Sequence, residues 1–153
     1  MSGETLTLDT NVLVYSVDRA AGPRHLIAKD IMLRAALLPC WLTLQSISEF
    51  YVVVTRKGMM LPEEAKSIAE TMIDLFRVAP PSVAAARSAL AQAAAGRVSY
   101  WDALLVATAA EAGCTTIFTE DLSHDTTISG VRVINPFGEE GLTPDAAALL
   151  TSG

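Results

Sequence analysis

The chain is poor in charge and in cysteine, and no apolar run in it is long enough to cross a membrane. Charged residues make up 18% of its 153 residues and hydrophobic ones 51%, which argues against a disordered chain and predicts one globular domain. The two cysteines, Cys40 and Cys114, form no C-x-x-C motif, so we expect buried free thiols in a reducing compartment. No positively charged apolar leader opens the chain. Together these features predict a cytoplasmic protein.

Basic residues are also scarce, since 11 bases face 17 acids and the net charge is −6. A strongly basic surface for non-specific nucleic-acid binding is therefore not expected. Two divalent ions bound by four of the acids would cancel four charges and leave about −2, so a nucleic-acid substrate is disfavoured but not excluded. The G-x-G-x-x-G, Walker A and G-x-S-x-G motifs are absent. The isolated His25 and His124 support neither a catalytic triad nor a zinc site.

Short apolar, β-branched runs alternate with stretches of helical spacing along most of the chain. The runs predict five strands, at residues 5–8, 41–44, 76–78, 114–119 and 131–134. This alternation predicts an α/β fold, with a parallel sheet covered by helices on both faces. Gly138, Gly141 and Pro144 predict a loosely held tail with at most one helical turn. We therefore expect a domain at 1–137 and a C-terminal tail at 138–153.

Four acids follow apolar runs or open predicted helices: Asp9, Glu49, Asp102 and Asp121. If each lies at a strand-to-helix junction, all four meet at the carboxyl edge of the parallel sheet. Carboxylates gathered there would repel one another unless a cation lay between them. Oxygen ligands favour Mg²⁺ or Mn²⁺ over zinc. Mg²⁺ in an acidic pocket is typical of phosphate-ester chemistry, where it activates water and neutralises the leaving oxygen.

Each acid also has a simpler interpretation as a helix cap. Asp9 and Asp121 can accept free backbone N–H groups at a helix or turn start. The S-x-x-E motif ending at Glu49 and the S-x-x-D motif ending at Asp102 are typical of capping boxes. The two interpretations overlap, because a helix N-terminus favours an anion.

Four segments together resemble the PIN-domain family, in particular the VapC-type toxins of bacterial toxin–antitoxin pairs. They are LDTNVLVYSVD (8–18), SISEFYVVVTRK (46–57), SYWDALLVATAAEAGCTTIFTEDL (99–122) and VRVINPF (131–137). The resemblance spans nearly the whole chain in the right order. It implies a five-stranded parallel sheet flanked by helices, and a Mg²⁺- or Mn²⁺-dependent endoribonuclease.

By position, the acids of the family pattern match Asp9, Glu49, Asp102 and Asp121. Asn11 matches the polar residue that usually supports the first aspartate, Asp9, and Thr119 matches a polar site residue beside Asp121. The segment Ser123-His124-Asp125 departs from the pattern, and Asp125 offers a spare carboxylate. Which of Asp121 and Asp125 binds metal more directly stays open, with Asp121 favoured. Glu49 or Asp102 would orient or deprotonate the attacking water.

The resemblance further implies an RNA substrate, a cognate VapB-type antitoxin and a homodimer, and no membrane partner. Arg56, Lys57 and Arg97 are candidate phosphate contacts, with an ordinary solvated surface as the simpler interpretation. Helices at 23–38 and 62–75 could supply the dimer interface. Two alternatives stay open: a catalytically silent PIN-like module that binds RNA or protein, and a PIN nuclease outside a toxin–antitoxin role.

Overall fold

Six strands form one sheet in the order β3-β2-β1-β4-β6-β5, in a computed structural model that describes residues 3–151. Their bounds are β1 (Leu6–Leu8), β2 (Cys40–Thr43), β3 (Arg77–Ala79), β4 (Thr116–Phe118), β5 (Thr127–Ile128) and β6 (Val131–Ile134). All neighbouring strands pair in parallel except β5 and β6, which are antiparallel. The α/β class with a parallel sheet is confirmed, and the expected count of five strands is one too few.

The additional strand, β5, belongs to a tight hairpin between the predicted strands at 114–119 and 131–134, where no strand was expected. Ile128 pairs with Val131, and the two residues between them have positive φ, 52° at Ser129 and 80° at Gly130. Two successive residues with positive φ are typical of a type I′ turn, which joins antiparallel strands. A strand of two residues is too short to produce a periodic sequence pattern.

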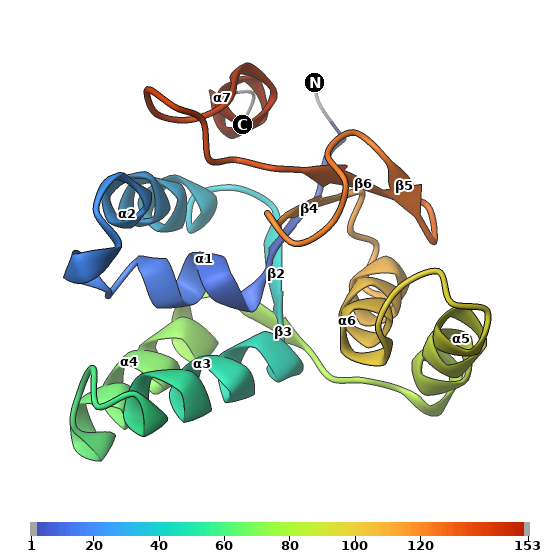
Figure 1. Ribbon diagram of the computed structural model, residues 1–153, viewed down its shortest axis with the longest axis horizontal. Coiled ribbons are helices and arrows are strands. Elements are labelled where there is room, and N and C mark those ends of the chain that lie inside the picture. The colour runs from blue at the N-terminus through green and yellow to red at the C-terminus, as the bar shows by residue number, and fades with distance from the viewer. Residues whose placement is uncertain (1–2, 152–153) are drawn as a thin grey trace.

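Seven α-helices and one 3₁₀ turn complete the described chain. Their bounds are α1 (Thr10–Tyr15), η1 (Arg19–Ala21), α2 (Pro23–Ala35), α3 (Leu44–Arg56), α4 (Pro62–Leu75), α5 (Val83–Ala94), α6 (Tyr100–Glu111) and α7 (Pro144–Thr151). Helices α1 to α4 lie on one face of the sheet, and α5 and α6 lie on the other (Figure 1). The predicted covering of both faces is confirmed.

The central strand β1 is buried along its whole length, because it has a neighbour on each edge and helices on each face. Leu6 and Leu8 belong to the main core, together with Leu13 from α1 and Ile31 from α2. The chain leaves β1 through Asp9, whose carboxylate accepts a hydrogen bond from the Thr10 N–H and caps α1. This buried strand therefore carries an ionisable side chain directly to the carboxyl edge of the sheet.

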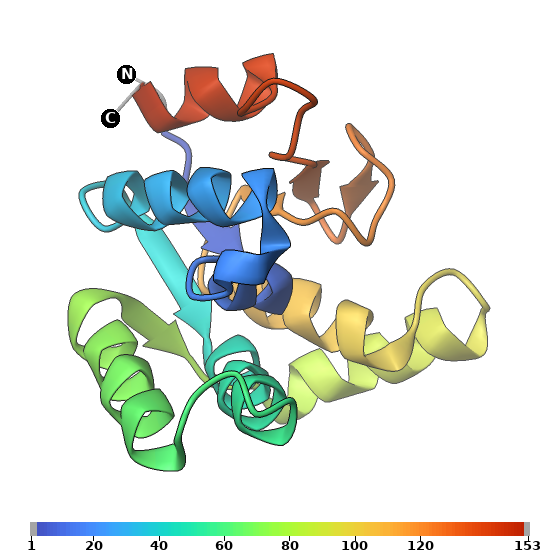
Figure 2. The same ribbon diagram turned by 60° about the vertical axis from the view of Figure 1, so that its left-hand side comes forward.

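The expectation of a loose C-terminal tail with at most one helical turn is wrong. Helix α7 spans eight residues, and Ala146 and Leu150 on it are buried in the main core. It packs beside α2, as Figure 2 shows. Pro144, interpreted as a loop residue, is the first residue of the helix. At this position the backbone N–H makes no hydrogen bond within the helix, so proline is tolerated there. The division into residues 1–137 and 138–153 stays a prediction.

Cys40 and Cys114 are buried free thiols, as expected. Burial raises the pKa of the Cys114 thiol to about 11, so it is protonated at neutral pH. Within residues 3–151, no helix combines the length and the apolar character that crossing a bilayer requires.

Candidate functional site

The site is built around two carboxylates that leave adjacent parallel strands. Asp9 directly follows β1, and Asp121 lies three residues beyond the end of β4. The strands are in register, Leu8 beside Phe118, and the Asp9 N–H donates to the Phe118 carbonyl at 3.0 Å. Parallel pairing therefore brings together two acids that are 112 positions apart in the sequence.

Thr119 connects the two acids. Its hydroxyl Oγ1 donates to Asp9 Oδ2 at 2.7 Å and accepts from the Asp121 N–H at 3.1 Å. The other Asp9 oxygen, Oδ1, accepts from the Thr10 N–H at 2.7 Å. Both oxygens of the Asp9 carboxylate are therefore fixed by short hydrogen bonds, so its orientation does not depend on a ligand.

Asp9 is only 7% exposed, and this burial is the main cause of an altered acidity. Burial, together with the neighbouring Asp121 carboxylate, raises the pKa of Asp9 to about 7, while the bonds from Thr119 and Thr10 oppose the rise. An ordinary aspartate is almost fully ionised near pH 7, whereas the raised pKa of Asp9 brings its titration into the neutral range. A raised pKa of this size is typical of a functional carboxylate.

Asn11 and Asp125 take different places around Asp121. The Asn11 amide Nδ2 donates to Asp121 Oδ2 at 3.0 Å. The expectation that Asn11 supports Asp9, two residues before it, is therefore wrong, because its side chain supports Asp121. Asp125 accepts from Arg132 Nε at 2.9 Å, an ion pair on the exposed surface. This places Asp125 in a separate salt-bridge network and Asp121 beside Asp9.

Glu49 lies in the second turn of α3, and its carboxylate is held from two sides. Thr10 Oγ1 donates to Oε2 at 3.3 Å, and Gln45 Nε2 donates to Oε1 at 2.8 Å. The capping-box interpretation of Glu49 is wrong, because α3 begins at Leu44 and its cap is Thr43, whose hydroxyl accepts from the Ser46 N–H. Ser46, the presumed cap, lies inside the helix.

Asp102 lies in the first turn of α6, where the Ser99 hydroxyl accepts its N–H at 3.3 Å. The interpretation of Ser99 as a helix cap is confirmed. Helix α6 follows α5 and not a strand, and β4 is followed by β5 with no helix between them. The expectation that all four acids occupy strand-to-helix junctions is therefore wrong for Asp102 and for Asp121. The Asp102 side chain lines the same cavity as Asp121, although α6 and α1 lie on opposite faces of the sheet.

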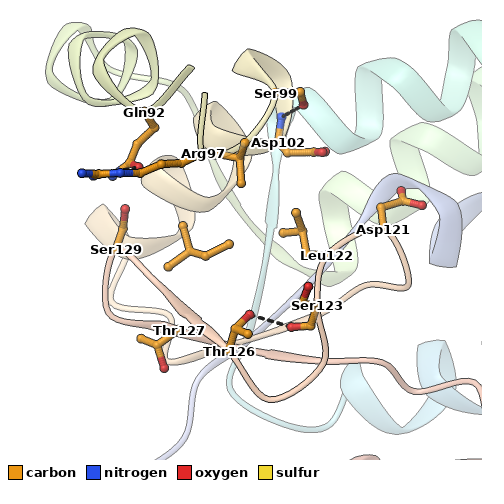
Figure 3. A pocket seen from close by; sticks show the side chains of 12 residues that line it. Gln92, Arg97, Ser99, Asp102, Asp121, Leu122, Ser123, Thr126, Thr127 and Ser129 are labelled. Carbon is orange, nitrogen blue, oxygen red and sulfur yellow. Dashed lines mark hydrogen bonds between the residues drawn. The ribbon is translucent and has the colours of Figure 1, made fainter. Parts of the chain in front are cut away.

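Asp102 and Asp121 line one open cavity of about 630 Å³ (Figure 3). Arg97 and Gln92 lie at the end of the cavity away from Asp121, and Arg97 Nη1 is 3.5 Å from Gln92 Oε1. The hairpin residues Thr127 and Ser129 complete that end. The cavity thus has carboxylates at one end and a guanidinium at the other.

The other two candidate phosphate contacts lie elsewhere. Arg56 is the last residue of α3 and Lys57 follows it, and both are exposed. At 1.5 Å per residue, Arg56 lies about 10 Å beyond Glu49 along the helix axis. Of the three bases singled out from the sequence, Arg97 alone lines the cavity with the acids.

The donor set fits a magnesium-type ion held by two protein carboxylates. Asp9 and Asp121 offer hard oxygen ligands. A cation between them would offset both causes of the raised Asp9 pKa, its burial first and the repulsion from Asp121 second. Mg²⁺ is usually held by one or two carboxylates and keeps several waters. Across residues 3–151, no three acidic, histidine or cysteine side chains lie close enough to form a metal cluster. The expected gathering of four carboxylates is thus reduced to one adjacent pair, with Glu49 and Asp102 farther out.

Two residues at the site were missed by sequence reasoning. Gln45 donates both to Glu49 and to the Trp101 carbonyl, at 3.0 Å, and so joins α3 to α6. Its spacing of four residues from Glu49 on a helix was an available signal. Glu120 contacts Tyr15 and Arg24, and no local pattern in the sequence pairs these three residues.

Comparison with known proteins gives one family and a set of similar folds. A family model described as PIN domain matches residues 6–127, which include all four acids. Among curated proteins, none matches the chain.

Several solved structures share the fold at low sequence identity. VapC20 of Mycobacterium tuberculosis, described as a sarcin-ricin loop cleaving toxin, has a TM-score of 0.60 and 19% identity over 76% of this chain and 92% of its own. DNA-bound VapBC from Salmonella typhimurium has a TM-score of 0.60 and 19% identity, over 85% and 96% of the two chains. A toxin–antitoxin complex from Klebsiella pneumoniae has a TM-score of 0.60 and 21% identity, over 87% and 98%. At these identities the likeness is one of fold.

Proposed function

The chain belongs to the PIN-domain family, and from this premise we propose that it is a divalent-metal-dependent endoribonuclease, the toxin of a toxin–antitoxin pair. The observation that carries the proposal is the buried Asp9 carboxylate beside Asp121, at the carboxyl edge of a parallel sheet and next to an open cavity. Open α/β sheets bind their ligands at this edge. A pair of carboxylates held without a basic partner is costly for a protein that does not bind a cation there.

In this proposal Asp9 and Asp121 hold a Mg²⁺ or Mn²⁺ ion, and Glu49 and Asp102 act at longer range. The ion would supply activation of water and neutralisation of charge at the phosphodiester. Thr119 and the Thr10 N–H orient Asp9, and Asn11 orients Asp121. These neutral donors fix the carboxylates without adding a positive charge that would compete with the ion.

Asp102 is the better candidate to orient or deprotonate the attacking water. It lines the cavity with Asp121, whereas the Glu49 oxygens are engaged by Thr10 and Gln45. A general base must come within hydrogen-bonding reach of the water it deprotonates. Glu49 is therefore assigned a role in joining the second turn of α3 to the start of α1 beside the ion.

An RNA strand fits the remaining features. Arg97 offers a charged contact for a phosphate at the far end of the cavity. Trp101 is 62% exposed on α6 and packs edge-on against Tyr100 with ring centroids 5.1 Å apart. Trp101 lines a neighbouring hollow together with Glu49 and Leu104, and an exposed tryptophan is a suitable stacking surface for an unpaired base.

The partner in this proposal is a VapB-type antitoxin, by analogy with complexes of similar fold described as VapBC and as toxin–antitoxin. Exposed apolar side chains on α3 and α4 offer area for a partner or a second copy of the chain: Leu44, Tyr51, Val52 and Ile73. Light scattering of the purified protein gives the mass of the assembly. A mass of two chains supports the homodimer, and a mass of one chain contradicts it.

Cleavage is tested by incubating the protein with unstructured, end-labelled RNA and Mn²⁺. We expect products with a 5′-phosphate and a 3′-hydroxyl, and no cleavage by Asp9→Asn, which keeps a good helix cap. Asp121→Asn should be inactive and Asp125→Asn active, since Asp125 pairs with Arg132. Equal cleavage by wild type and Asp9→Asn would reveal a contaminating nuclease and refute the assignment.

A catalytically silent PIN module is the second candidate, and one observation favours it. In the described part of the chain, no group of three potential ligands is close enough for a metal cluster. The two candidates differ in thermal melting with Mn²⁺. A nuclease should gain stability by mass action, by about 2.7 kcal/mol at an ion concentration of one hundred times Kd, and a silent module should not.

A further inference from the structure

Glu120 lies between Thr119 and Asp121, but its side chain contacts a different part of the molecule. The Tyr15 hydroxyl donates to Glu120 Oε1, and Arg24 Nε donates to Oε2 at 3.0 Å. The Glu120 side chain is 16% exposed, so these two donors satisfy a largely buried carboxylate. Residues at the end of α1 and the start of α2 thus hold both oxygens of a residue in the loop after β4.

Aromatic contacts make this arrangement rigid. The rings of Tyr15 and Phe137 meet edge to face, with centroids 5.3 Å apart, and the Arg24 guanidinium lies 5.8 Å from the Phe137 ring centroid. Such cation–π and edge-to-face contacts favour a single orientation of the planar groups. His25 Nδ1 lies 2.8 Å from the Tyr15 carbonyl and fixes the backbone there. We call Tyr15, Arg24 and Glu120 the Glu120 anchor.

Beyond Asp121 the loop has further attachments: Leu122 packs against the buried cluster beside β4 and β6, the Asp125 N–H donates to the Val133 carbonyl at 2.7 Å, and Asp125 pairs with Arg132. Asp121, Ser123 and Asp125 in it are exposed. The contacts that place the Asp121 side chain and backbone are the hydrogen bonds from Asn11 and to Thr119 Oγ1. Asp121 itself is exposed, so a largely buried contact at the preceding residue adds a restraint on its position.

We propose that Tyr15 and Arg24 are positioning residues that act through Glu120 to hold Asp121 beside Asp9 for ion binding. This inference rests on the proposed function, because it concerns the same ion. The anchor touches neither acid directly, so its effect passes along one residue of backbone. Groups that orient a metal ligand in this way commonly contribute ten- to hundredfold to metal affinity.

The alternative is that the anchor only joins α1, α2 and the C-terminal segment for stability. Tyr15→Phe distinguishes positioning of Asp121 from a purely stabilising role, because it removes one hydroxyl and keeps the ring that contacts Phe137 and Arg24. Arg24→Gln is the second variant; Arg24 is exposed, so its replacement does not disturb the core. Glu70→Gln is the matched control, since it removes a glutamate from the exposed Lys66–Glu70 pair on α4.

Two measurements are made on each full-length variant: the Kd for Mn²⁺ by calorimetry, and amide hydrogen exchange of residues 119–123 in metal-free protein. We expect Tyr15→Phe and Arg24→Gln to weaken Mn²⁺ binding about tenfold or more and to speed exchange of the Asp121 amide. Glu70→Gln should match wild type in both. In an Asp121→Asn background, Tyr15→Phe should cause no further loss of Mn²⁺ affinity, because the ligand it positions is gone.

Lower melting temperature with unchanged Mn²⁺ affinity would overturn the inference and leave the anchor a structural contact. Unchanged affinity with faster exchange would overturn it as well. If wild type binds no Mn²⁺, the metal part of the proposed function fails, and exchange of the Asp121 amide alone decides whether the anchor positions this residue. Unchanged exchange would then refute it.

Discussion

Asp9→Asn should stabilise the metal-free protein at neutral pH, although it alters a buried residue at the centre of the fold. Asparagine caps a helix about as well as aspartate, so the bond to the Thr10 N–H is kept. The amide has the same shape as the carboxyl group and is never charged. The substitution therefore removes the cost of holding a buried negative charge beside Asp121. It also replaces one of the two accepting oxygens, so the Thr119 hydroxyl, which donates to Asp9 Oδ2 in wild type, must accept from the amide instead.

The magnitude follows from the pKa of Asp9, which burial and the Asp121 carboxylate raise from an ordinary 3.8 to about 7. The folded state binds this proton more tightly than the unfolded state, so its stability falls as pH rises between about 4 and about 7. Below that window both states are protonated and the group contributes no cost. Above that window the folded state bears the full free-energy cost of the charged Asp9 carboxylate, which is on the order of 4 kcal/mol at 1.36 kcal/mol per pKa unit. Asp9→Asn should thus gain stability over wild type across this window and keep the gain above pH 7.

The measurement is urea unfolding of both proteins in EDTA-containing buffer at several pH values from 4 to 8. Asp30→Asn is the control, since Asp30 is a half-exposed aspartate paired with Arg34 on α2 and should change stability by no more than about 1 kcal/mol. A wild-type to Asp9→Asn difference that stays constant with pH would refute the reasoning. So would a wild-type protein that becomes relatively more stable as pH rises, because that requires a lowered pKa at Asp9.

Leu150→Ala should lower the free energy of unfolding in urea by about 2–5 kcal/mol, because Leu150 on α7 is buried in the main core. A loss under about 0.5 kcal/mol would show that α7 is only loosely held. Thr119→Val removes the hydroxyl that lowers the Asp9 pKa, so carboxyl ¹³C NMR should report a pKa above the wild-type value and calorimetry a weaker affinity for Mn²⁺. Arg97→Gln, tested in an Asp9→Asn background to prevent cleavage, should weaken RNA binding and reduce its salt dependence by about one counterion. Arg56→Gln should change RNA binding much less, and equal effects of the two would argue against the cavity as the phosphate contact.

The sequence was informative about the site because acids at strand ends stand out against apolar runs. Asp9 and Asp121 are located by this pattern, and parallel pairing of β1 and β4 brings them together. The capping-box interpretation of Glu49 failed, because S-x-x-E is only a local pattern. It predicts Ser46 as the cap of α3, whereas the actual cap, Thr43, lies three residues before Ser46. The prediction that Asp102 follows a strand was also wrong, because α6 follows the helix α5. Local patterns indicate where a helix can begin, whereas packing decides where it does.

Hydrophobic periodicity alone determined that this chain forms a parallel sheet covered by helices, because the burial of apolar side chains dominates folding and repeats along the sequence. That topology predicts that the functional site lies at the carboxyl edge of the sheet. Only the tertiary structure decided which carboxylates touch, that Asn11 supports Asp121, that α7 joins the core and that Tyr15 and Arg24 hold Glu120. These contacts join residues up to 110 positions apart, and side-chain hydrogen bonds across such separations leave no periodic trace in the sequence.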